Sequence, residues 1–304
     1  MTEFTIRPAT VDDVEHFARI RAVVTPWLGA SIAAQRSWYL SAPARARGIR
    51  LCAEVEGQVV GFATGGLNVT TSQVGASALT LLVHPGFRER GIGTALLTAA
   101  EEHLRSVGAT QLQCGTNDDP KTLAWAERHG FRQGASERYS VIDPRVLPPQ
   151  PPTPDGVTVV SLAEVTPEAV HELDTIAFAD EPGDVPYDGI PFEEFVVKFW
   201  DAPDLDRYSS VVAIVDGVAV SSVLLDVNSE TGWAMSGGTC TLPAYRGRGL
   251  AKLLKSVSLR RAAEVGVTAA YTSNDYTNLP MLAVNDWLGY RVTDRQWSYL
   301  KDLT

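Results

Sequence analysis

The chain alternates short apolar runs, bounded by glycine, proline and acidic residues, with longer segments in which apolar residues recur every three or four positions. Short runs of this kind are typical of β-strands, and the longer segments are typical of amphipathic helices. In the first 142 residues the pattern predicts strands at 4–7, 50–55, 59–64, 78–83, 111–116 and 137–142, and helices that begin at 12 and cover 93–107 and 121–129.

The same order of elements returns in the second half of the chain. A glycine-containing turn joins two strands in each half, at 56–58 and at 216–217, and predicts a hairpin. The sequence therefore predicts two copies of one α+β unit. The second copy is predicted to have strands at 157–161, 211–215, 218–226, 234–241, 269–272 and 296–301, and helices at 168–178, 192–200, 251–265 and 278–288.

A proline-rich segment separates the two copies. Six of the 18 prolines lie between residues 143 and 155. Proline supplies no backbone donor to a sheet and favours extended polyproline geometry. We therefore predict an N-terminal domain at 1–142, a linker at 143–155 and a C-terminal domain at 156–304.

Composition narrows the class of protein further. No stretch of about 18 apolar residues occurs, and the N-terminus lacks the charged and apolar regions of a signal peptide. The three cysteines, Cys52, Cys114 and Cys240, are far apart, and the five histidines are scattered singly. This distribution fits neither a disulfide framework nor a zinc site. We expect a cytoplasmic protein without a bound metal ion.

The formal net charge of −10 is concentrated in the second half. Residues 1–142 hold 14 basic and 13 acidic residues, whereas residues 156–304 hold 11 and 21. The segment 164–206 alone carries 13 acids and one base, Lys198. This balance argues against nucleic acid or an anionic membrane as a partner. The acidic segment is either a solvated surface or an electrostatic funnel for a cationic substrate.

Each half places a glycine-rich turn between an apolar strand and an amphipathic helix. The turns read Val83-His-Pro-Gly-Phe-Arg88-Glu-Arg90-Gly91-Ile-Gly93-Thr94 and Thr241-Leu-Pro-Ala-Tyr-Arg246-Gly-Arg248-Gly249-Leu-Ala251-Lys252. Small residues let backbone N–H groups approach an anion, and a helix N-terminus adds unpaired donors. The paired arginines add charge-assisted hydrogen bonds. The turns therefore predict phosphate binding rather than a solvated helix start, although they match neither the P-loop nor the dinucleotide fingerprint.

The spacing Arg-x-x-Gly-x-Gly/Ala in these turns resembles the acyl-coenzyme A pyrophosphate loop of the GNAT superfamily of N-acetyltransferases. The order of elements resembles that superfamily too, and the resemblance covers both halves, in a layout similar to mycothiol synthase. It implies an α+β fold of two tandem GNAT-like domains, each with a mixed, mostly antiparallel sheet flanked by helices. It also implies acetyl-coenzyme A (acetyl-CoA) as acyl donor, and no metal.

The resemblance further implies which residues contact the cofactor. The strand before each loop splays from its neighbour, so that its backbone pairs with the pantetheine arm as a strand would. Asparagines after the next strand and early in the following helix add contacts. The residues implied are Leu82, Val83, Arg88, Arg90, Gly91, Gly93, Thr94, Asn117, Cys240, Thr241, Arg246, Arg248, Gly249, Ala251, Lys252, Asn274 and Asn278.

Both halves depart from the superfamily at the general acid. The superfamily often has Tyr four residues before the Gly that ends the last helix, where this chain has Ala126 and Asn285. Ala126 has no proton to donate, and Asn285 can donate a hydrogen bond to a thiolate but cannot protonate it. Neither strand before the loop carries a Glu base. The catalytic candidates are therefore Asn285, Asp226 and Tyr276, the last two having ordinary alternatives as a hairpin-end carboxylate and a turn aromatic.

We expect the C-terminal half to be catalytic and the N-terminal half to be structural or to bind cofactor without turnover. The C-terminal half keeps Asn274, Asn278 and the donor Asn285, and it carries the acidic segment. The expected function is an acetyl-CoA-dependent N-acetyltransferase that moves acetyl directly to a primary amine in a ternary complex. The expected acceptor is small and cationic, such as an amino sugar, a polyamine-like compound or a basic antibiotic, in preference to a peptide or protein N-terminus.

Two other classes of function stay open. The two missing tyrosines are compatible with a non-catalytic acyl-CoA sensor, which would bind the cofactor without turnover. A scaffold whose paired domains mainly dimerise would not bind coenzyme A at all. No nucleic-acid or membrane partner is expected, and the chain is left open as a monomer or a homodimer.

Overall fold

The computed structural model describes residues 3–304, and these form two compact units. Unit 1 consists of the described residues up to Leu28, with Ile32–Ser136 and Arg295–Thr304. Unit 2 consists of Gly29–Ser31 and Glu137–Asp294. Each unit is a mixed sheet flanked by helices, as the sequence predicts.

The sheet of unit 1 has the strand order β1-β2-β3-β4-β5-β12, in which only β4 and β5 are parallel. Helix α2 is absent from the prediction because its apolar residues do not recur at helical spacing. Only Ala34 and Gln35 of this helix are buried. The elements are β1 (Thr5–Pro8), α1 (Val14–Val24), α2 (Ile32–Leu40), β2 (Ile49–Val55), β3 (Gln58–Leu67), β4 (Ala76–Val83), α3 (Ile92–Ser106), β5 (Gln111–Asn117), α4 (Pro120–Arg128) and β12 (Arg291–Asp302).

The sheet of unit 2 repeats this plan in the order β7-β8-β9-β10-β11-β6, with β10 and β11 parallel. Its elements are β6 (Arg132–Ile142), β7 (Val157–Ser161), α5 (Pro167–Ala177), α6 (Phe192–Phe195), β8 (Val211–Val215), β9 (Val218–Asn228), β10 (Trp233–Thr241), α7 (Leu250–Glu264), β11 (Ala269–Asp275) and α8 (Leu279–Leu288). Short 3-10 turns lie at Val11–Asp13, Ala44–Ala46, Pro85–Phe87, Leu162–Glu164 and Pro243–Tyr245, and a π turn lies at Val196–Trp200.

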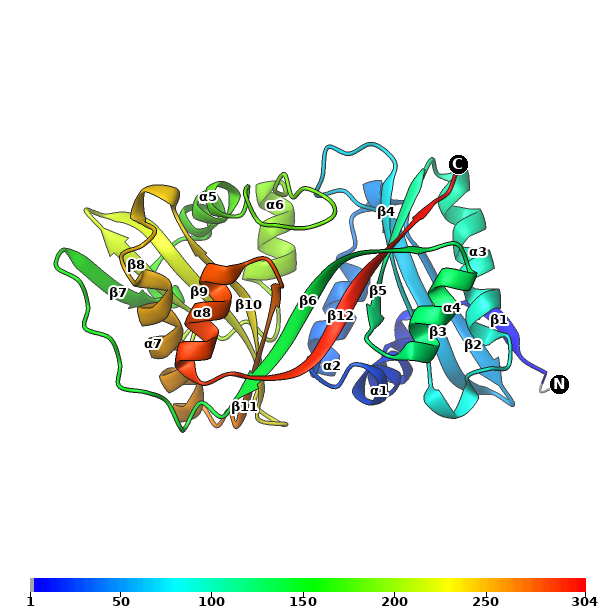
Figure 1. Cartoon of the computed structure of the whole chain (residues 1–304), viewed down its shortest axis with the longest axis horizontal. Helices are drawn as coiled ribbons and strands as arrows, with labels where there is room; N and C mark the ends of the chain where they lie inside the picture. Colours follow the sequence, from blue (N-terminus) through cyan, green and yellow to red (C-terminus); the bar gives the residue numbers. More distant parts are fainter. Residues whose placement is uncertain (1–2) are drawn as a thin grey trace. The chain divides into compact units, whose positions relative to one another are not determined.

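The two halves of the chain exchange their last strands, which the predicted domain division does not include. Strand β12, red in Figure 1, comes from the second half of the chain but pairs with β5 of unit 1, from Gln296↔Asn117 to Asp302↔Gln111. Strand β6 comes from the first half but pairs with β11 of unit 2. The boundary therefore runs through β6 and β12, because each strand completes the sheet of the unit that pairs with it.

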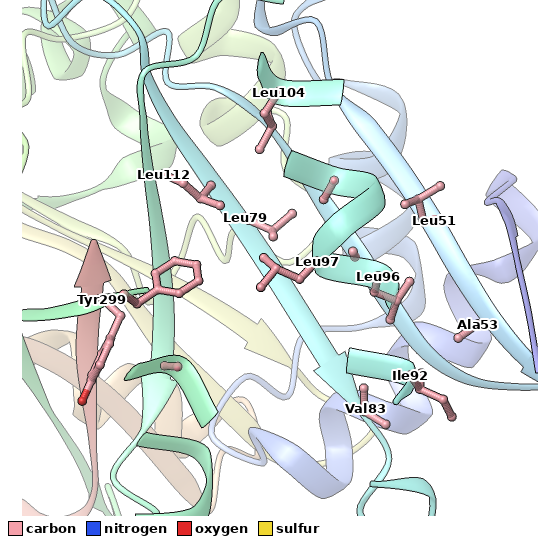
Figure 2. Packing of buried hydrophobic residues seen from close by; sticks show 14 of the residues in the cluster. Leu51, Ala53, Leu79, Val83, Ile92, Leu96, Leu97, Leu104, Leu112 and Tyr299 are labelled. Carbon is pink, nitrogen blue, oxygen red and sulfur yellow. The ribbon is translucent and has the colours of Figure 1, made fainter. Parts of the chain in front are cut away.

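Helices cover both faces of each sheet, so each sheet has a core on either side. In unit 1 the larger core lies under α3 and α4, where Leu96 and Leu97 of α3 pack with Leu79 of β4 and Leu112 of β5 (Figure 2). Tyr299 of β12 is buried in the same core. The C-terminal strand thus contributes a large core side chain to unit 1.

The hairpin turns explain why the two units share one register. Glu56 and Gly57 have φ of 51° and 79°, and Asp216 and Gly217 have φ of 49° and 81°. Two successive residues with positive φ make the type I′ turn that matches the twist of a hairpin. Counting from these turns aligns β3 with β9 residue by residue.

Candidate active site

In both units the two parallel strands part before they end. Strand β4 pairs with β5 from Ala76↔Gln111 to Leu79↔Cys114 and then diverges. Strand β10 pairs with β11 only from Trp233↔Ala269 to Met235↔Tyr271. The later residues of these strands are therefore left without a partner across the gap, which agrees with the splay that the resemblance implies. The fork of unit 2 lies at Met235 and Tyr271.

A glycine is the N-cap of the helix that follows the predicted anion-binding loop in each unit. Gly91 precedes α3 and Gly249 precedes α7, with φ of 85° and 80°. A Cβ on Gly249 would meet no atom within 4 Å, and a Cβ on Gly91 would meet only Phe4, at 3.9 Å. The space beside both N-cap glycines is thus open at the helix N-termini, whose first N–H groups have no partner within the helix.

The motif arginines fasten these loops as well as offering charge. Nε of Arg246 donates to the carbonyl of Thr241 at 3.1 Å, and Nε of Arg88 donates to that of Val83 at 3.2 Å. The guanidinium of Arg246 also forms two hydrogen bonds with Asp180, at 2.5 and 2.9 Å. This ties the loop to the segment after α5.

The second arginine of each motif behaves in the same way in both units. Arg90 donates to the carbonyl of Gly86 and lies over the Phe87 ring, and Arg248 makes the corresponding hydrogen bond, to Ala244. Arg248 lies over the ring of Tyr245, at 4.8 Å from its centroid.

Strand β10 carries a β-bulge that β4 lacks. Ser236 pairs with Leu225 and Gly238 pairs with Leu224, so Gly237 is an extra residue without a partner. Strand β4 pairs with β3 without any shift in register. A bulge bends the strand and leaves backbone groups unpaired. In unit 2 it therefore turns backbone donors out of the ladder just beyond the fork.

The carboxylate of Asp226 lies beside this bulge. Asp226 pairs with Met235 across the ladder, and a Cβ on Gly237 would lie 3.7 Å from its Oδ2. Burial raises the pKa of Asp226 to about 6, and the nearby charge of Asp204 adds to this rise. Within residues 3–304 no hydrogen bond ends on this carboxylate. Such a carboxylate is suited to accept a proton near neutral pH.

Further polar groups line the face of β10 that α5 covers. The thiol of Cys240 donates to Oδ1 of Asp174 at 3.4 Å and lies 3.2 Å from the hydroxyl of Ser222. Burial raises the pKa of Asp174 to about 6 and raises that of the Cys240 thiol well above its ordinary value. The thiol is therefore held protonated, which does not favour it as a nucleophile.

The predicted asparagines of unit 2 gather on the face covered by α7 and α8. Nδ2 of Asn285 donates to Oδ1 of Asn274 at 2.6 Å. Asn285 is 1% exposed, and its own Oδ1 is buried without a hydrogen-bond partner. Asn278 caps α8, with its Oδ1 accepting from the N–H of Met281. The structure thus brings Asn274 and Asn285 together.

The predicted asparagine of unit 1, Asn117, connects elements of the fold through its side chain. Asn117 donates to the carbonyl of Val24 and accepts from Gln296, both at 2.8 Å. These bonds tie β5 to the end of α1 and to β12. Both the donor and the acceptor of its side chain are therefore engaged within the fold.

Unit 1 also lacks the carboxylate beside its fork. The counterpart of Asp226, counted from the hairpin turns, is Gly66, where a Cβ would lie 2.6 Å from the carbonyl oxygen of Ala46. The face under α1 is filled by a cluster in which Phe17 and Phe62 stack, with ring centroids 4.4 Å apart. A side chain at position 66 would therefore collide with the backbone of Ala46.

The remaining predicted residues lie at the edges of these sites. Thr94 makes a 3.0 Å hydrogen bond with His129, and Lys252 places its Nζ 4.3 Å from the centroid of the Trp287 ring. Tyr276 is exposed in the turn between β11 and α8 and is not buried with Asp226. A Cβ on Gly93 would lie 3.5 Å from the ring of Trp125.

Part of the acidic segment 164–206 is neutralised within the fold. Asp180 pairs with Arg246, and Glu164 accepts from the backbone of Ser161. Burial raises the pKa of Glu181, and the nearby charges of Glu137 and Asp275 raise it further. Glu181 of the segment thus lies near two further acidic side chains, from β6 and β11.

A sequence profile described as the acetyltransferase (GNAT) family matches residues 17–131 and again residues 170–290. The chain belongs to the acetyltransferase (GNAT) family. The two matches confirm the tandem arrangement, and they account for the glycine-rich loop and the splayed strands in each unit. GNAT enzymes use acetyl-CoA, and the open loops and parted strands of both units fit such a donor.

The relatives of this GNAT protein carry one recurring name. It is 29% identical over 228 residues to a mycothiol acetyltransferase from Nocardioides sp., covering 71% of this chain and 77% of that protein. It is 27% identical over 258 residues to a mycothiol acetyltransferase from Saccharomonospora viridis, covering 82% of each. These relatives and the family match confirm that the protein is an N-acetyltransferase.

Two solved structures share the tandem GNAT fold. A tandem GNAT protein from the clavulanic acid biosynthesis pathway aligns with a TM-score of 0.74 over 99% of both chains, at 21% identity. A GCN5-related N-acetyltransferase from Sphaerobacter thermophilus aligns with a TM-score of 0.75 at 21% identity, over 99% of this chain and 96% of that chain. They confirm the predicted α+β fold and carry no information about the acceptor.

Sequence reasoning missed two buried groups of the GNAT unit 2. Asp174 lies in the acidic segment, but only the fold shows that it meets Cys240. Lys255 looks like a surface residue of an amphipathic helix, yet it is buried. Among the described residues no group of three His, Cys, Asp or Glu side chains could hold a metal ion, and no helix there is long and apolar enough to cross a membrane.

Proposed function

We propose that unit 2 transfers the acetyl group of acetyl-CoA to the primary amine of a small cationic acceptor. The transfer is direct, in a ternary complex of enzyme, acetyl-CoA and amine. The observation that carries this proposal is the carboxylate of Asp226 beside the bulge of β10, just beyond the fork of β10 and β11. Unit 1 has a loop and a fork but no such carboxylate.

The acyl donor is bound by the loop and the splay of unit 2. The backbone N–H groups after Gly249 and the guanidinium of Arg248 hold the pyrophosphate, while Arg246 keeps the loop in place through Asp180. The unpaired edge of β10 hydrogen-bonds the pantetheine arm as an added strand. The remaining contacts are assigned to Cys240, Thr241, Gly249, Ala251, Lys252, Asn274 and Asn278.

The chemistry requires a neutral amine next to the thioester. Asp226 accepts a proton from the acceptor ammonium, because its pKa of about 6 leaves it ionised at neutral pH. The amine nitrogen then attacks the carbonyl carbon, and negative charge develops on the carbonyl oxygen. A backbone N–H turned out of the ladder at the bulge stabilises that charge.

A cationic acceptor suits the charges around this site. Asp226 and Asp174 lie on the face of the sheet under α5, and neither is paired with a basic side chain in the described part of the chain. Glu181, Glu137 and Asp275 add negative charge near the end of β11. An ammonium group reaching Asp226 offsets these charges, and its acetylation removes the attraction and favours release.

We further propose that unit 1 does not turn over. Its apolar cluster around Phe17 and Phe62 occupies the face on which unit 2 carries Asp174 and Asp226. It keeps the features of an acyl-CoA loop, namely Arg88, Gly91 and Gly93, so its role is structural or cofactor binding. Cofactor contact by these residues of unit 1 stays a prediction.

The test is the release of free thiol from acetyl-CoA with a panel of cationic, neutral and anionic amines, including the acceptor of the mycothiol acetyltransferases. Gly249→Glu and Gly91→Glu serve as a matched pair, because each side chain would project a carboxylate into open space at a helix N-terminus. We expect release with cationic amines, lost in Gly249→Glu and kept in Gly91→Glu.

Each other outcome has a definite meaning. Loss of activity only in Gly91→Glu would move the reaction to unit 1. Preference for anionic amines would contradict the cationic acceptor. Absence of release with every amine, with coenzyme A binding confirmed by calorimetry, would favour the acyl-CoA sensor over the enzyme.

A further inference from the structure

Lys255 is a lysine buried in unit 2 without an acidic partner. It lies on α7, is 2% exposed, and forms no ion pair within the described chain. Its Nζ donates to Oγ1 of Thr272 at 3.3 Å and lies 5.2 Å from the centroid of the Tyr290 ring. Burying an ammonium group with so little compensation destabilises the fold, so the residue calls for a functional reason.

The partner of Lys255 lies at the fork of the parted strands. The last pair between β10 and β11 is Met235↔Tyr271, and Thr272 is the next residue of β11. Its side chain points to the face covered by α7, opposite to the face on which Asp226 lies, since Leu225 and Leu224 beside Asp226 pack on α7 and α5 respectively. The two groups thus approach the fork from opposite faces.

A second polar pair continues on the same face. Asn274 lies two residues after Thr272, and alternation puts both on one face of β11. Asn274 accepts from Asn285, whose buried Oδ1 has no partner. Lys255, Thr272, Asn274 and Asn285, which we call the fork cluster, therefore line the α7 and α8 side of the gap where the donor is proposed to lie.

Unit 1 shows that the fold does not need a lysine at this place. Counted from Gly91 and Gly249, the counterpart of Lys255 is Leu97 (Figure 2), and Leu97 belongs to the same buried core as Phe131. Phe131 in turn corresponds to Tyr290, the residue after the glycine that follows the last helix. The leucine and phenylalanine of unit 1 are therefore replaced by a lysine and a tyrosine in unit 2, the unit that carries Asp226.

We propose that Lys255, acting through Thr272, supplies the proton to the sulfur of coenzyme A as the thioester breaks. This inference rests on the proposed function. The amine nitrogen forms its bond to the carbonyl carbon and gives up its second proton to solvent, and the C–S bond breaks with its electron pair going to sulfur. The hydroxyl proton of Thr272 moves to sulfur while an ammonium proton of Lys255 moves to the Thr272 oxygen. Lys255 is left neutral and regains a proton from solvent after the products leave.

The surroundings of Lys255 favour this transfer. Burial lowers the pKa of Lys255 to about 7, so the ammonium gives up its proton readily near neutral pH. The titratable side chain that lies next to Lys255 is the phenol of Tyr290. Burial raises the pKa of this phenol, so the phenol stays neutral. Thr272 and Asn285 are uncharged. No carboxylate in the described chain holds the proton on Lys255.

The test measures the ionisation of the coenzyme A thiol bound to the full protein, which needs no acceptor amine. The ultraviolet absorbance of the thiolate is followed against pH for the wild type and Lys255→Met, with saturation by coenzyme A confirmed by calorimetry. Below a pH of about 7, where Lys255 carries its proton, we expect the bound thiol of the wild type to have an effective pKa about one unit lower, which is a tenfold higher thiolate fraction. With an acceptor, Lys255→Met lowers kcat and leaves KM for acetyl-CoA unchanged.

Thermal stability separates a catalytic lysine from a structural one. Lys255→Met removes a buried charge at a place where unit 1 has leucine, so we expect a higher Tm at pH 7. The gain should shrink as pH rises from about 7 toward 10.5, because only unfolded chains still carry the proton in that range. Lys301→Met is the control, since Lys301 lies over Phe131 but pairs with the buried Glu101 at 2.5 Å. It should lower Tm and leave the thiol pKa unchanged.

The outcomes distinguish this inference from the function on which it rests. If the wild type does not bind coenzyme A, the proposed function and this inference both fail. If coenzyme A binds with the same thiol pKa in wild type and Lys255→Met, Lys255 is not the proton source. A lower Tm in Lys255→Met with unchanged kcat would make it a structural residue. Retained kcat in Thr272→Ser and a reduced kcat in Thr272→Val are expected for the relay.

Discussion

Asp226 and Gly66 occupy corresponding positions in the two units, and in the proposed mechanism this difference places the base in unit 2. Asp226 has room for a carboxylate beside a bulge, whereas a Cβ on Gly66 would meet the carbonyl of Ala46 at 2.6 Å. A substitution Gly66→Asp therefore cannot install a base in unit 1 without moving the segment around Ala46. Activity by this mechanism depends on unit 2.

We predict that Asp226→Asn lowers kcat/KM by about a hundredfold to ten-thousandfold, the usual worth of a general base. In the wild type kcat/KM should fall below a pH of about 6, because the carboxylate of Asp226 is protonated there. This acid limb should vanish in the variant, while the Kd for coenzyme A stays the same. Asp216→Asn, in the exposed hairpin turn, is the control, and an unchanged rate in Asp226→Asn would remove Asp226 from the reaction.

At the scale of elements, the bulge of β10 distinguishes this strand from β4, although the two strands have similar sequence patterns. Both strands are followed by the same loop and helix, and both part from their parallel neighbour. Only β10 contains an extra residue, Gly237. Since a bulge redirects the backbone locally, it is the feature that, in the proposed mechanism, points a backbone donor at the carbonyl oxygen.

We predict that Gly237→Val blocks the acceptor without damaging the fold. A Cβ there would keep an ordinary contact of 3.7 Å with Oδ2 of Asp226, but the added methyl groups would occupy the space in front of the carboxylate. Steady-state kinetics should give a kcat/KM for the amine at least about tenfold lower, with an unchanged Kd for coenzyme A. Thr80→Val on β4 is the matched control, and equal effects of the two substitutions would place the acceptor elsewhere.

Elements were predicted unevenly along the chain. The strand–loop–helix segments around Gly91 and Gly249 carry strong periodicity and lie where they were expected. Helix α2 was missed because little of it is buried, and α6 is only four residues long before it passes into a π turn. Strands β6 and β12 begin earlier than predicted, because their first residues are mostly polar and do not continue the apolar pattern.

At the scale of the whole molecule, the exchange of β6 and β12 makes each unit depend on the other half of the sequence. Tyr299 and Leu303 belong to the second half but lie in the core of unit 1. Ile142 belongs to the first half but lies in the core of unit 2. The two halves therefore complete one another's sheets, and neither half carries a complete sheet by itself.

We predict that core substitutions in the exchanged strands destabilise the unit they complete. Tyr299→Ala should speed hydrogen exchange of the β5 amides at 111–117, and Ile142→Ala should speed that of the β11 amides at 269–275. The expected losses are about 3–5 and 2–5 kcal/mol, typical of large buried side chains. Tyr299→Ala acting on β11 instead would contradict the exchange.

The sequence by itself determined the tandem α+β plan and the two glycine-rich turns, and the resemblance to the GNAT superfamily showed that Ala126 and Asn285 stand where a tyrosine is usual. These follow from local periodicity and from residues a few positions apart, which is the range over which backbone geometry is set. Only the tertiary structure decided that Asp226 meets a bulge, that Lys255 is buried at the fork, and that the last strands are exchanged. Those features depend on strand register and on burial by segments that are distant in the sequence. Neither can be predicted from the local pattern of apolar and polar residues.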